Sequence, residues 1–147
     1  MDPNVSDRLR RLDEICREKG LPVTSQRRTV LEVLLRRSDH PTADQIYEAV
    51  QACIAQISRR TVYRVLDTLV EFGLIRQVHH PGATVRFDGM ISRHHHLVCI
   101  RCHKIVDLES STLDKVSLPP SKQQGFAIHD FSVQFMGVCP DCRKDTK

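Results

Sequence analysis

Two short cysteine motifs are the residues of this sequence best suited to binding a metal. Cys99 and Cys102 form one C-x-x-C pair, and Cys139 and Cys142 form a second. Four thiolates in two such pairs match a tetrahedral site with four sulfur ligands. The spacing therefore predicts a structural Zn²⁺ ion, and it requires that the turns carrying the two pairs meet in the fold.

Three consecutive histidines, His94, His95 and His96, directly precede the first cysteine pair. Imidazole nitrogens offer ligands for a second, different metal, because thiolate sites select other ions. His94 and His96 lie two positions apart, so in a strand they share one face while His95 points to the other. We therefore expect His94 and His96 to act together.

Composition limits the classes of protein to which this chain can belong. Of its 147 residues, 40% are hydrophobic and 27% are charged, which is typical of a soluble globular protein. No apolar run approaches the ~20 residues that span a bilayer, and the N-terminus lacks the apolar core of a signal peptide. We expect a cytoplasmic protein without a membrane partner, and its net charge of +4 fits nucleic-acid binding.

The six cysteines are expected to stay reduced in that compartment, which favours metal binding over disulfides. Cys16 and Cys53 lie outside the two motifs, on the apolar faces of predicted helices. We expect both to be buried as small hydrophobic residues.

The N-terminal half of the sequence predicts four helices separated by short turns. Apolar residues recur at helical spacing from about residue 6 to 18. Thr24 or Ser25, Thr42 and Ser58 can each cap one of the three helices that follow.

The fourth predicted helix carries polar side chains where a DNA-binding helix needs them. Its first two turns hold Arg59, Arg60, Tyr63 and Arg64, and in a helix-turn-helix these turns enter the major groove. Arginine binds both phosphate and guanine, and tyrosine adds a flat ring with a hydroxyl group. The alternative is a small helical bundle whose exposed arginines are merely solvated.

The stretch LIRQVHHPGATVRFDG, which follows this helix, predicts two short strands around a turn at residues 80–83. A helix-turn-helix followed by a β-hairpin is the winged-helix arrangement, which favours DNA binding over the bundle. We therefore predict a winged-helix DNA-binding domain at residues 1–83.

Apolar residues alternate from Thr84 onward, so strands dominate the C-terminal half. The last strand is expected within residues 126–139, and the segment before it holds a short helix broken by Pro119 and Pro120. Residues 84–147 are predicted to form a small α/β domain with an antiparallel sheet, which makes the fold class α+β.

Taken together, these motifs resemble the ferric uptake regulator family of dimeric, metal-dependent repressors. The matching segments run from about residue 20 to 143 and read TSQR, HPTADQIY, SRRTVYRVLDTLVEFGLI, RFD, HHHLVCIRCHKIVDLE and GVCPDC. The resemblance implies a homodimer, built from the α/β domain, that binds double-stranded DNA at an A/T-rich palindromic operator. It also adds Arg27, as a support for contacts to the DNA backbone, to the four DNA-binding residues above.

The resemblance assigns a metal to each group of ligands. It gives the structural zinc to the four cysteines, and it gives a regulatory metal to His40, Asp88, His94, His96 and Asp107. Three imidazoles and two carboxylates suit Fe²⁺ or Mn²⁺, whereas thiolates would favour Zn²⁺. Because His40 comes from the DNA-binding half, the metal would tie the two domains together and set the spacing of two recognition helices.

Two aspartates point to one branch of the family. Iron-uptake regulators usually have glutamate at the positions of Asp88 and Asp107, whereas peroxide-responsive members have aspartate at both. Arg93 and Phe131 stand where members with three metal sites have histidine ligands, so no further regulatory site is expected there.

In the peroxide-responsive branch, bound Fe²⁺ reacts with hydrogen peroxide and a ligand histidine is oxidised, so that repression is lifted. By resemblance, His40 and His94 are the candidates to become 2-oxo-histidine, and Mn²⁺ would leave the repressor insensitive. The alternative is an iron-responsive ferric uptake repressor, in which the same site reports iron supply.

Two further classes are disfavoured. A zinc-uptake regulator generally recruits a cysteine that is absent from this histidine set. A zinc hydrolase would need an H-E-x-x-H or H-x-E…C-x-x-C pattern, which the sequence lacks. We therefore expect no enzymatic activity and no small-molecule substrate beyond the metal and peroxide.

Overall fold

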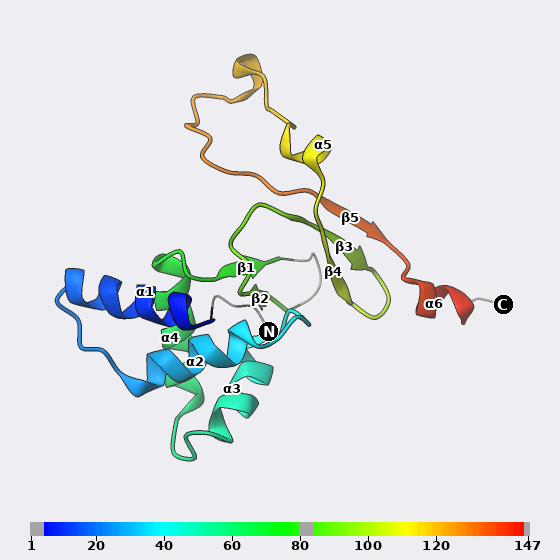
Figure 1. Ribbon diagram of the computed structural model, residues 1–147. Coiled ribbons are helices and arrows are strands. Elements are labelled where there is room, and N and C mark those ends of the chain that lie inside the picture. The colour runs from blue at the N-terminus through cyan, green and yellow to red at the C-terminus, as the bar shows by residue number, and fades with distance from the viewer. Residues whose placement is uncertain (1–4, 80–83, 146–147) are drawn as a thin grey trace. The chain divides into compact units, whose positions relative to one another are not determined.

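The computed structural model describes residues 5–79 and 84–145, which form two compact units that divide between Ile91 and Ser92 (Figure 1). We expected this boundary between residues 83 and 84. Strand β2 (Arg86–Asp88) pairs with β1 (Arg76–Val78), so it belongs to the first unit. The turn expected at residues 80–83 lies outside the described residues.

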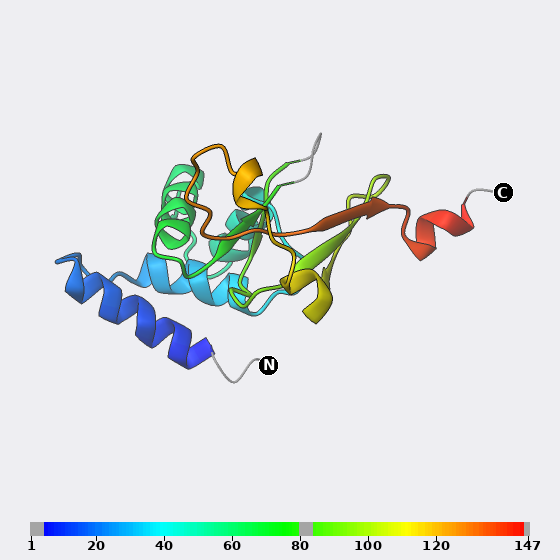
Figure 2. The same ribbon diagram turned by 90° about the horizontal axis from the view of Figure 1, so that it is seen from above.

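The first unit confirms the four predicted helices, and Figure 2 shows α1 and α2 side by side. Their bounds are α1 Val5–Glu18, α2 Ser25–Leu35, α3 Ala43–Gln51 and α4 Arg59–Glu71. The hydroxyls of Thr24, Thr42 and Ser58 each accept a backbone N–H from the first turn of the helix that follows. Such caps satisfy amide groups that a helix leaves without partners, and each contributes about 1 kcal/mol.

One apolar core holds the helices and the hairpin of the first unit together. Its fully buried members come from all four helices and from the segment before β1, and they include Leu12, Val30, Leu31, Leu34, Ile46, Val50, Val62, Leu66, Leu69 and Ile75. Cys16 is buried in this core as expected. Cys53 is exposed instead, because α3 ends at Gln51 and Cys53 lies in the turn beyond it.

Strands β1 and β2 form an antiparallel hairpin directly after α4 and complete the winged helix. Phe87 in β2 joins the core, and its N–H donates to the carbonyl of Pro41 at 2.9 Å. The hairpin is therefore fixed against the loop between α2 and α3. None of the described helices is long and apolar enough to cross a membrane.

The second unit is a three-stranded sheet in the order β4-β3-β5, with bounds β3 His95–Cys99, β4 Ile105–Leu108 and β5 Gln134–Gly137. Strands β3 and β4 are antiparallel, as predicted, whereas β5 runs parallel to β3 and makes the sheet mixed. Three short helices accompany it: α5 Ser111–Asp114, the 3₁₀ turn η1 Pro120–Lys122 and α6 Pro140–Lys144.

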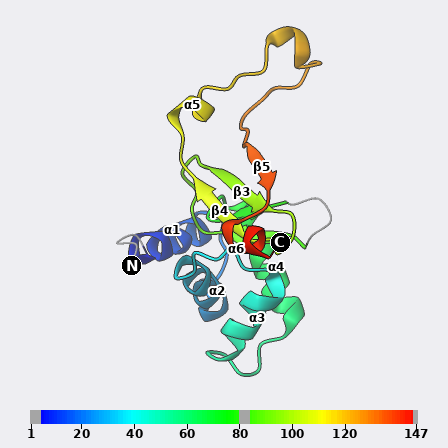
Figure 3. The same cartoon turned by 90° about the vertical axis from the view of Figure 1, so that its right-hand side faces the viewer.

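A long irregular segment between α5 and β5 extends away from this sheet (Figures 1 and 3). It contains η1 at the predicted proline break. The last strand is shorter than expected, because residues 126–133 stay irregular and regular pairing begins at Gln134. Helix α6 was not expected, although Pro140 occupies its first turn, where the missing proline N–H costs no hydrogen bond.

Candidate metal centres and nucleic-acid surface

The four motif cysteines converge at one end of the sheet in the second unit. Cys99 ends β3 and Cys102 follows in the next turn, while Cys139 caps α6 and Cys142 lies within it. Because β5 is parallel to β3, the C-terminal ends of both strands lie at the same edge. All four sulfur atoms lie within 4.8 Å of one another.

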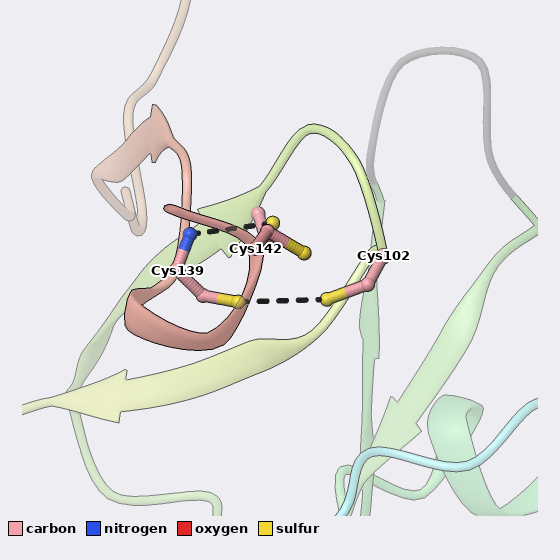
Figure 4. A group of neighbouring side chains, drawn as sticks. Cys102, Cys139 and Cys142 are labelled. Atoms are coloured by element: carbon pink, nitrogen blue, oxygen red, sulfur yellow. Dashed lines mark hydrogen bonds between the residues drawn. The ribbon is translucent and has the colours of Figure 1, made fainter. Parts of the chain in front are cut away.

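The sulfur spacing fits a zinc ion. A tetrahedral site with Zn–S bonds of about 2.3 Å places its sulfur atoms about 3.8 Å apart. The Sγ atoms of Cys102 and Cys139 are 3.7 Å apart and face each other in Figure 4, and both cysteines are unbridged. The site is thus preformed within a single unit.

The electrostatics of these thiols also call for a cation. Backbone N–H groups of Cys102 and Cys139 lower the pKa of the Cys99 thiol to about 5. Hydrogen bonding to Cys139 raises the pKa of the Cys142 thiol to about 12, because neighbouring sulfurs hold its proton in place. A divalent ion replaces such shared protons and stabilises all four thiolates together.

A histidine and a carboxylate meet in the first unit. The Nε2 atom of His40 lies 3.3 Å from Oδ2 of Asp88, and the second oxygen of that carboxylate accepts the N–H of Met90 at 2.9 Å. The His40 carbonyl accepts a hydrogen bond from Arg86 at 3.2 Å, which ties the loop to β2. His40 has a φ of 51°, a left-handed conformation that is rare outside glycine and clusters at functional sites.

Two histidines share a carboxylate in the second unit. His94 Nε2 and His96 Nε2 lie 3.3 Å and 3.4 Å from the same oxygen of Asp107. Residues His96 and Asp107 are direct partners across β3 and β4, which explains how the strand pairing assembles this group. The two imidazole rings stand edge to face with centroids 4.8 Å apart.

The hydrogen bonding of His94 leaves one ring nitrogen suited to a metal. Its Nδ1 lies 2.7 Å from the carbonyl oxygen of Ser92, and a carbonyl can only accept, so Nδ1 carries the proton. In the neutral ring, Nε2 then presents a lone pair to the Asp107 carboxylate. A cation between His94 Nε2 and the Asp107 carboxylate would remove the repulsion between them. A metal-binding histidine typically donates its other ring N–H to a carbonyl or carboxylate, as His94 does to Ser92.

His95 points to a different set of partners. Its Nδ1 accepts the N–H of Val133 at 3.1 Å, so its Nε2 carries the proton and donates to Asp114 at 2.9 Å. The Arg93 guanidinium stacks over the Phe131 ring at 4.6 Å, and that ring lies 6.1 Å from the His95 ring. These groups satisfy one another through stacking and hydrogen bonds within the second unit.

The predicted DNA-binding side chains lie on the surface of the first unit. Arg59, Arg60, Tyr63 and Arg64 are all exposed in the first two turns of α4. Arg27 is half-buried at the start of α2, where its guanidinium donates to the Pro22 carbonyl at 2.6 Å.

Asp44, in the first turn of α3, is a residue of this surface that sequence reasoning missed. Its carboxylate accepts hydrogen bonds from the Tyr63 hydroxyl and from the Arg59 guanidinium, the latter at 2.6 Å. The Arg59 guanidinium also lies 4.8 Å above the Tyr47 ring. An acidic side chain on the helix before the arginine-rich one, within HPTADQIY, was the available signal.

Comparisons with known proteins agree with this architecture. The "Peroxide operon regulator" of Bacillus subtilis (strain 168) is 37% identical over 131 residues, which are 89% of this chain and 90% of that protein. A crystal structure of the Campylobacter jejuni peroxide stress regulator has a TM-score of 0.69 and 28% identity, with 91% of this chain and 98% of that chain covered.

The ferric uptake regulator Fur of Helicobacter pylori shows the same fold over 97% of this chain and 96% of its own, with a TM-score of 0.82 and 21% identity. Residues 18–136 match the sequence pattern of the Ferric uptake regulator family. The chain therefore belongs to the ferric uptake regulator family, whose members are metal-responsive transcription regulators rather than enzymes.

Proposed function

We propose that this chain is a cytoplasmic, peroxide-responsive repressor that binds DNA as a metal-loaded homodimer. The observation that carries the proposal is the pair of histidine–carboxylate groups, His40 with Asp88 and His94 and His96 with Asp107, in which both carboxylates are aspartates. Relatives named for peroxide response at 30–37% identity support the same branch.

One Fe²⁺ or Mn²⁺ ion joins the two groups into a single regulatory site. Asp88 and His94 are separated only by the segment Gly89–Arg93, so the chain holds them within on the order of 20 Å of each other. This short connection gives the two groups a high effective concentration. Three imidazole nitrogens and two carboxylates make the hard, mixed donor set that such ions prefer.

Zinc has a separate role in the cysteine site. A site with four thiolates leaves no open position for a substrate or oxidant, so the bound ion is structural. It fastens the turn after β3 to α6 and thereby holds β3 and β5 together at that edge.

Peroxide acts through the ligand histidines. An Fe²⁺ ion held by these ligands would supply one electron to open the O–O bond of hydrogen peroxide, and the ring, on being oxidised, would return one electron to the iron. In the balanced reaction, one peroxide oxygen is inserted at Cε1 of His40 or His94, giving 2-oxo-histidine, and the other leaves as water. The oxidised ring is a poor ligand, so the connection between the two units is lost and DNA is released.

Homodimerisation involves an apolar row across the sheet of the second unit. Leu97 of β3 lies between Val106 of β4 and Phe135 of β5, and these side chains are 43%, 43% and 48% exposed. Pairing two such faces would bury apolar surface and give one dimer two copies of α4, one for each half of an operator. Two-fold symmetry then matches the A/T-rich palindromic operator.

The test loads the zinc-containing chain with Fe²⁺, adds hydrogen peroxide and follows DNA binding together with intact mass. We expect loss of DNA binding, with the mass of one oxygen atom added to a peptide that contains His40 or His94. The Mn²⁺-loaded chain is the control and should keep both its mass and its affinity. Release without the adduct, reversed by fresh Fe²⁺, would instead favour the iron-responsive repressor.

A further inference from the structure

Asp44 is an acidic side chain that the structure places against two of the predicted DNA-binding residues of α4, Arg59 and Tyr63. It belongs to α3, yet one of its oxygens accepts from both Arg59 and Tyr63, at the first and second turns of α4. Arg60 and Arg64 lie on the same two turns and are exposed. Of these four side chains, Arg59 and Tyr63 are therefore hydrogen-bonded to the Asp44 carboxylate, whereas Arg60 and Arg64 are exposed beside them.

We propose that Asp44 is a specificity-determining residue, an inference that rests on the proposed DNA-binding function. Its carboxylate restricts the Tyr63 hydroxyl to accepting hydrogen bonds from the base edges. A phenol has a single proton, and here Tyr63 donates it to Asp44. The hydroxyl oxygen can then only accept hydrogen bonds from DNA.

This restriction selects among the groups that DNA presents. The donors in the major groove are the amino groups of adenine N6 and cytosine N4, whereas phosphate oxygens, guanine O6 and N7, and thymine O4 are acceptors. Tyr63 held by Asp44 therefore favours adenine or cytosine at its contact position and gains nothing from a phosphate. The base edge, not the backbone, becomes its partner.

Asp44 also reduces the contribution of Arg59 to the non-specific electrostatic attraction between the protein and DNA phosphates. The guanidinium is paired with the carboxylate at 2.6 Å and packed over Tyr47, so its charge is locally compensated. Every phosphate neutralised by a protein steepens the salt dependence of binding. Arg59 is thus withheld from backbone contacts, which leaves Arg60 and Arg64 to supply them.

Protonation states support this division. Hydrogen bonding from Tyr63, and then from Arg59, lowers the pKa of the Asp44 carboxyl, while the bond to Asp44 raises the pKa of the Tyr63 phenol. The pair therefore stays a carboxylate and a protonated phenol around neutral pH.

The experiment compares the wild-type chain with Asp44→Ala, each loaded with Zn²⁺ and Mn²⁺. The probes are a duplex recovered from a random-sequence pool with the wild-type chain, and a scrambled duplex of equal length. Fluorescence anisotropy over a range of KCl concentrations measures both affinities. We expect Asp44→Ala to bind the scrambled duplex more tightly, to lose roughly tenfold in selectivity, and to steepen the salt slope by about one per protomer.

Further variants isolate the cause. Glu48→Ala removes one negative charge from another exposed position of α3. It should leave the salt dependence of DNA affinity and the selectivity between the two duplexes unchanged. Tyr63→Phe removes the hydroxyl, so adding Asp44→Ala to it should change the salt slope but not the base preference. Asp44→Asn, which keeps the shape of the side chain, should show the steeper slope even if Asp44→Ala folds poorly.

The inference is overturned if Asp44→Ala keeps the wild-type slope and selectivity, or if both duplexes lose affinity equally. Equal loss would mean that Asp44 only stabilises the packing of α3 against α4. If the wild-type chain recovers no sequence from the pool, the DNA-binding function itself fails, and this result is seen before any variant is compared.

Discussion

The two candidate metal-binding regions of this molecule differ in how completely one unit forms them. The four cysteine sulfurs lie within 4.8 Å of one another in the second unit alone. The proposed regulatory ligands are divided, with His40 and Asp88 in the first unit and His94, His96 and Asp107 in the second. A site complete within one unit stabilises that unit, whereas a divided site can report on a signal, because losing its metal separates two parts without unfolding either.

Removing a zinc ligand should give the largest effect in this comparison. For Cys102→Ser we expect loss of zinc and of cooperative unfolding in the second unit, because a structural zinc contributes on the order of 10 kcal/mol, as much as a whole domain's stability. Metal analysis and thermal unfolding by circular dichroism measure the change. Cys53→Ser, at an exposed cysteine, is the control; zinc retention by Cys102→Ser would contradict the assignment.

Removing a proposed ligand from the divided site should lower the affinity for the regulatory metal without unfolding either unit. His40→Ala is expected to lower the affinity for Mn²⁺ by at least about 100-fold, since loss of outer partners alone costs about 10–100-fold. Zinc content should not change. Calorimetric titration with Mn²⁺ measures the affinity, with His129→Ala, at an exposed histidine, as the control. A variant with wild-type Mn²⁺ affinity would exclude His40 as a ligand.

Lengthening both carboxylates should separate metal binding from peroxide chemistry. In the double variant Asp88→Glu and Asp107→Glu, Mn²⁺ should still bind, but oxidation of His40 or His94 should slow by up to about 100-fold, because small displacements of reacting groups are costly. Quantitative peptide mass spectrometry after Fe²⁺ and peroxide gives the rate. An unchanged rate would show that the choice of aspartate does not set peroxide sensitivity.

The smallest effect is expected at His95, which lies between the two proposed regulatory histidines in the chain and is assigned to neither metal. His95→Ala should cost about 1–3 kcal/mol of stability, because Asp114 and the Val133 N–H lose a buried partner. Denaturant unfolding measures this loss, and both metals should bind with wild-type stoichiometry. Loss of the regulatory metal would place His95 among the ligands.

Local patterns carried most of what the sequence could predict. The caps at Thr24, Thr42 and Ser58 lie where hydroxyl residues precede apolar helical repeats, and the helix and strand types followed from periodicity. The pairing of the cysteines followed from the chemistry of their spacing. These features depend on neighbours in the chain, which the sequence displays directly.

Features that depend on distant partners could not be predicted in this way. Period-two alternation is the same for parallel and antiparallel strands, so nothing local showed that β5 runs parallel to β3. The irregular course of residues 126–133 likewise reflects the absence of a strand pairing there, not of strand-forming residues. Asp44 could be placed against Tyr63 only once the packing of α3 on α4 was known.

Strand β3 has a further consequence, because it carries the proposed zinc ligand Cys99 at one end and the proposed regulatory ligand His96 near the other, with His94 directly before it. Cys99 faces Gly137 and His96 faces Gln134 along the same pair of strands. Side chains alternate, so sliding a strand by a single residue exchanges its two faces. Such a slip would present His95 to the proposed regulatory metal in place of His94 and His96. A zinc ion bound at the far end of β3 would therefore fix the strand register that places His94 and His96 on one face.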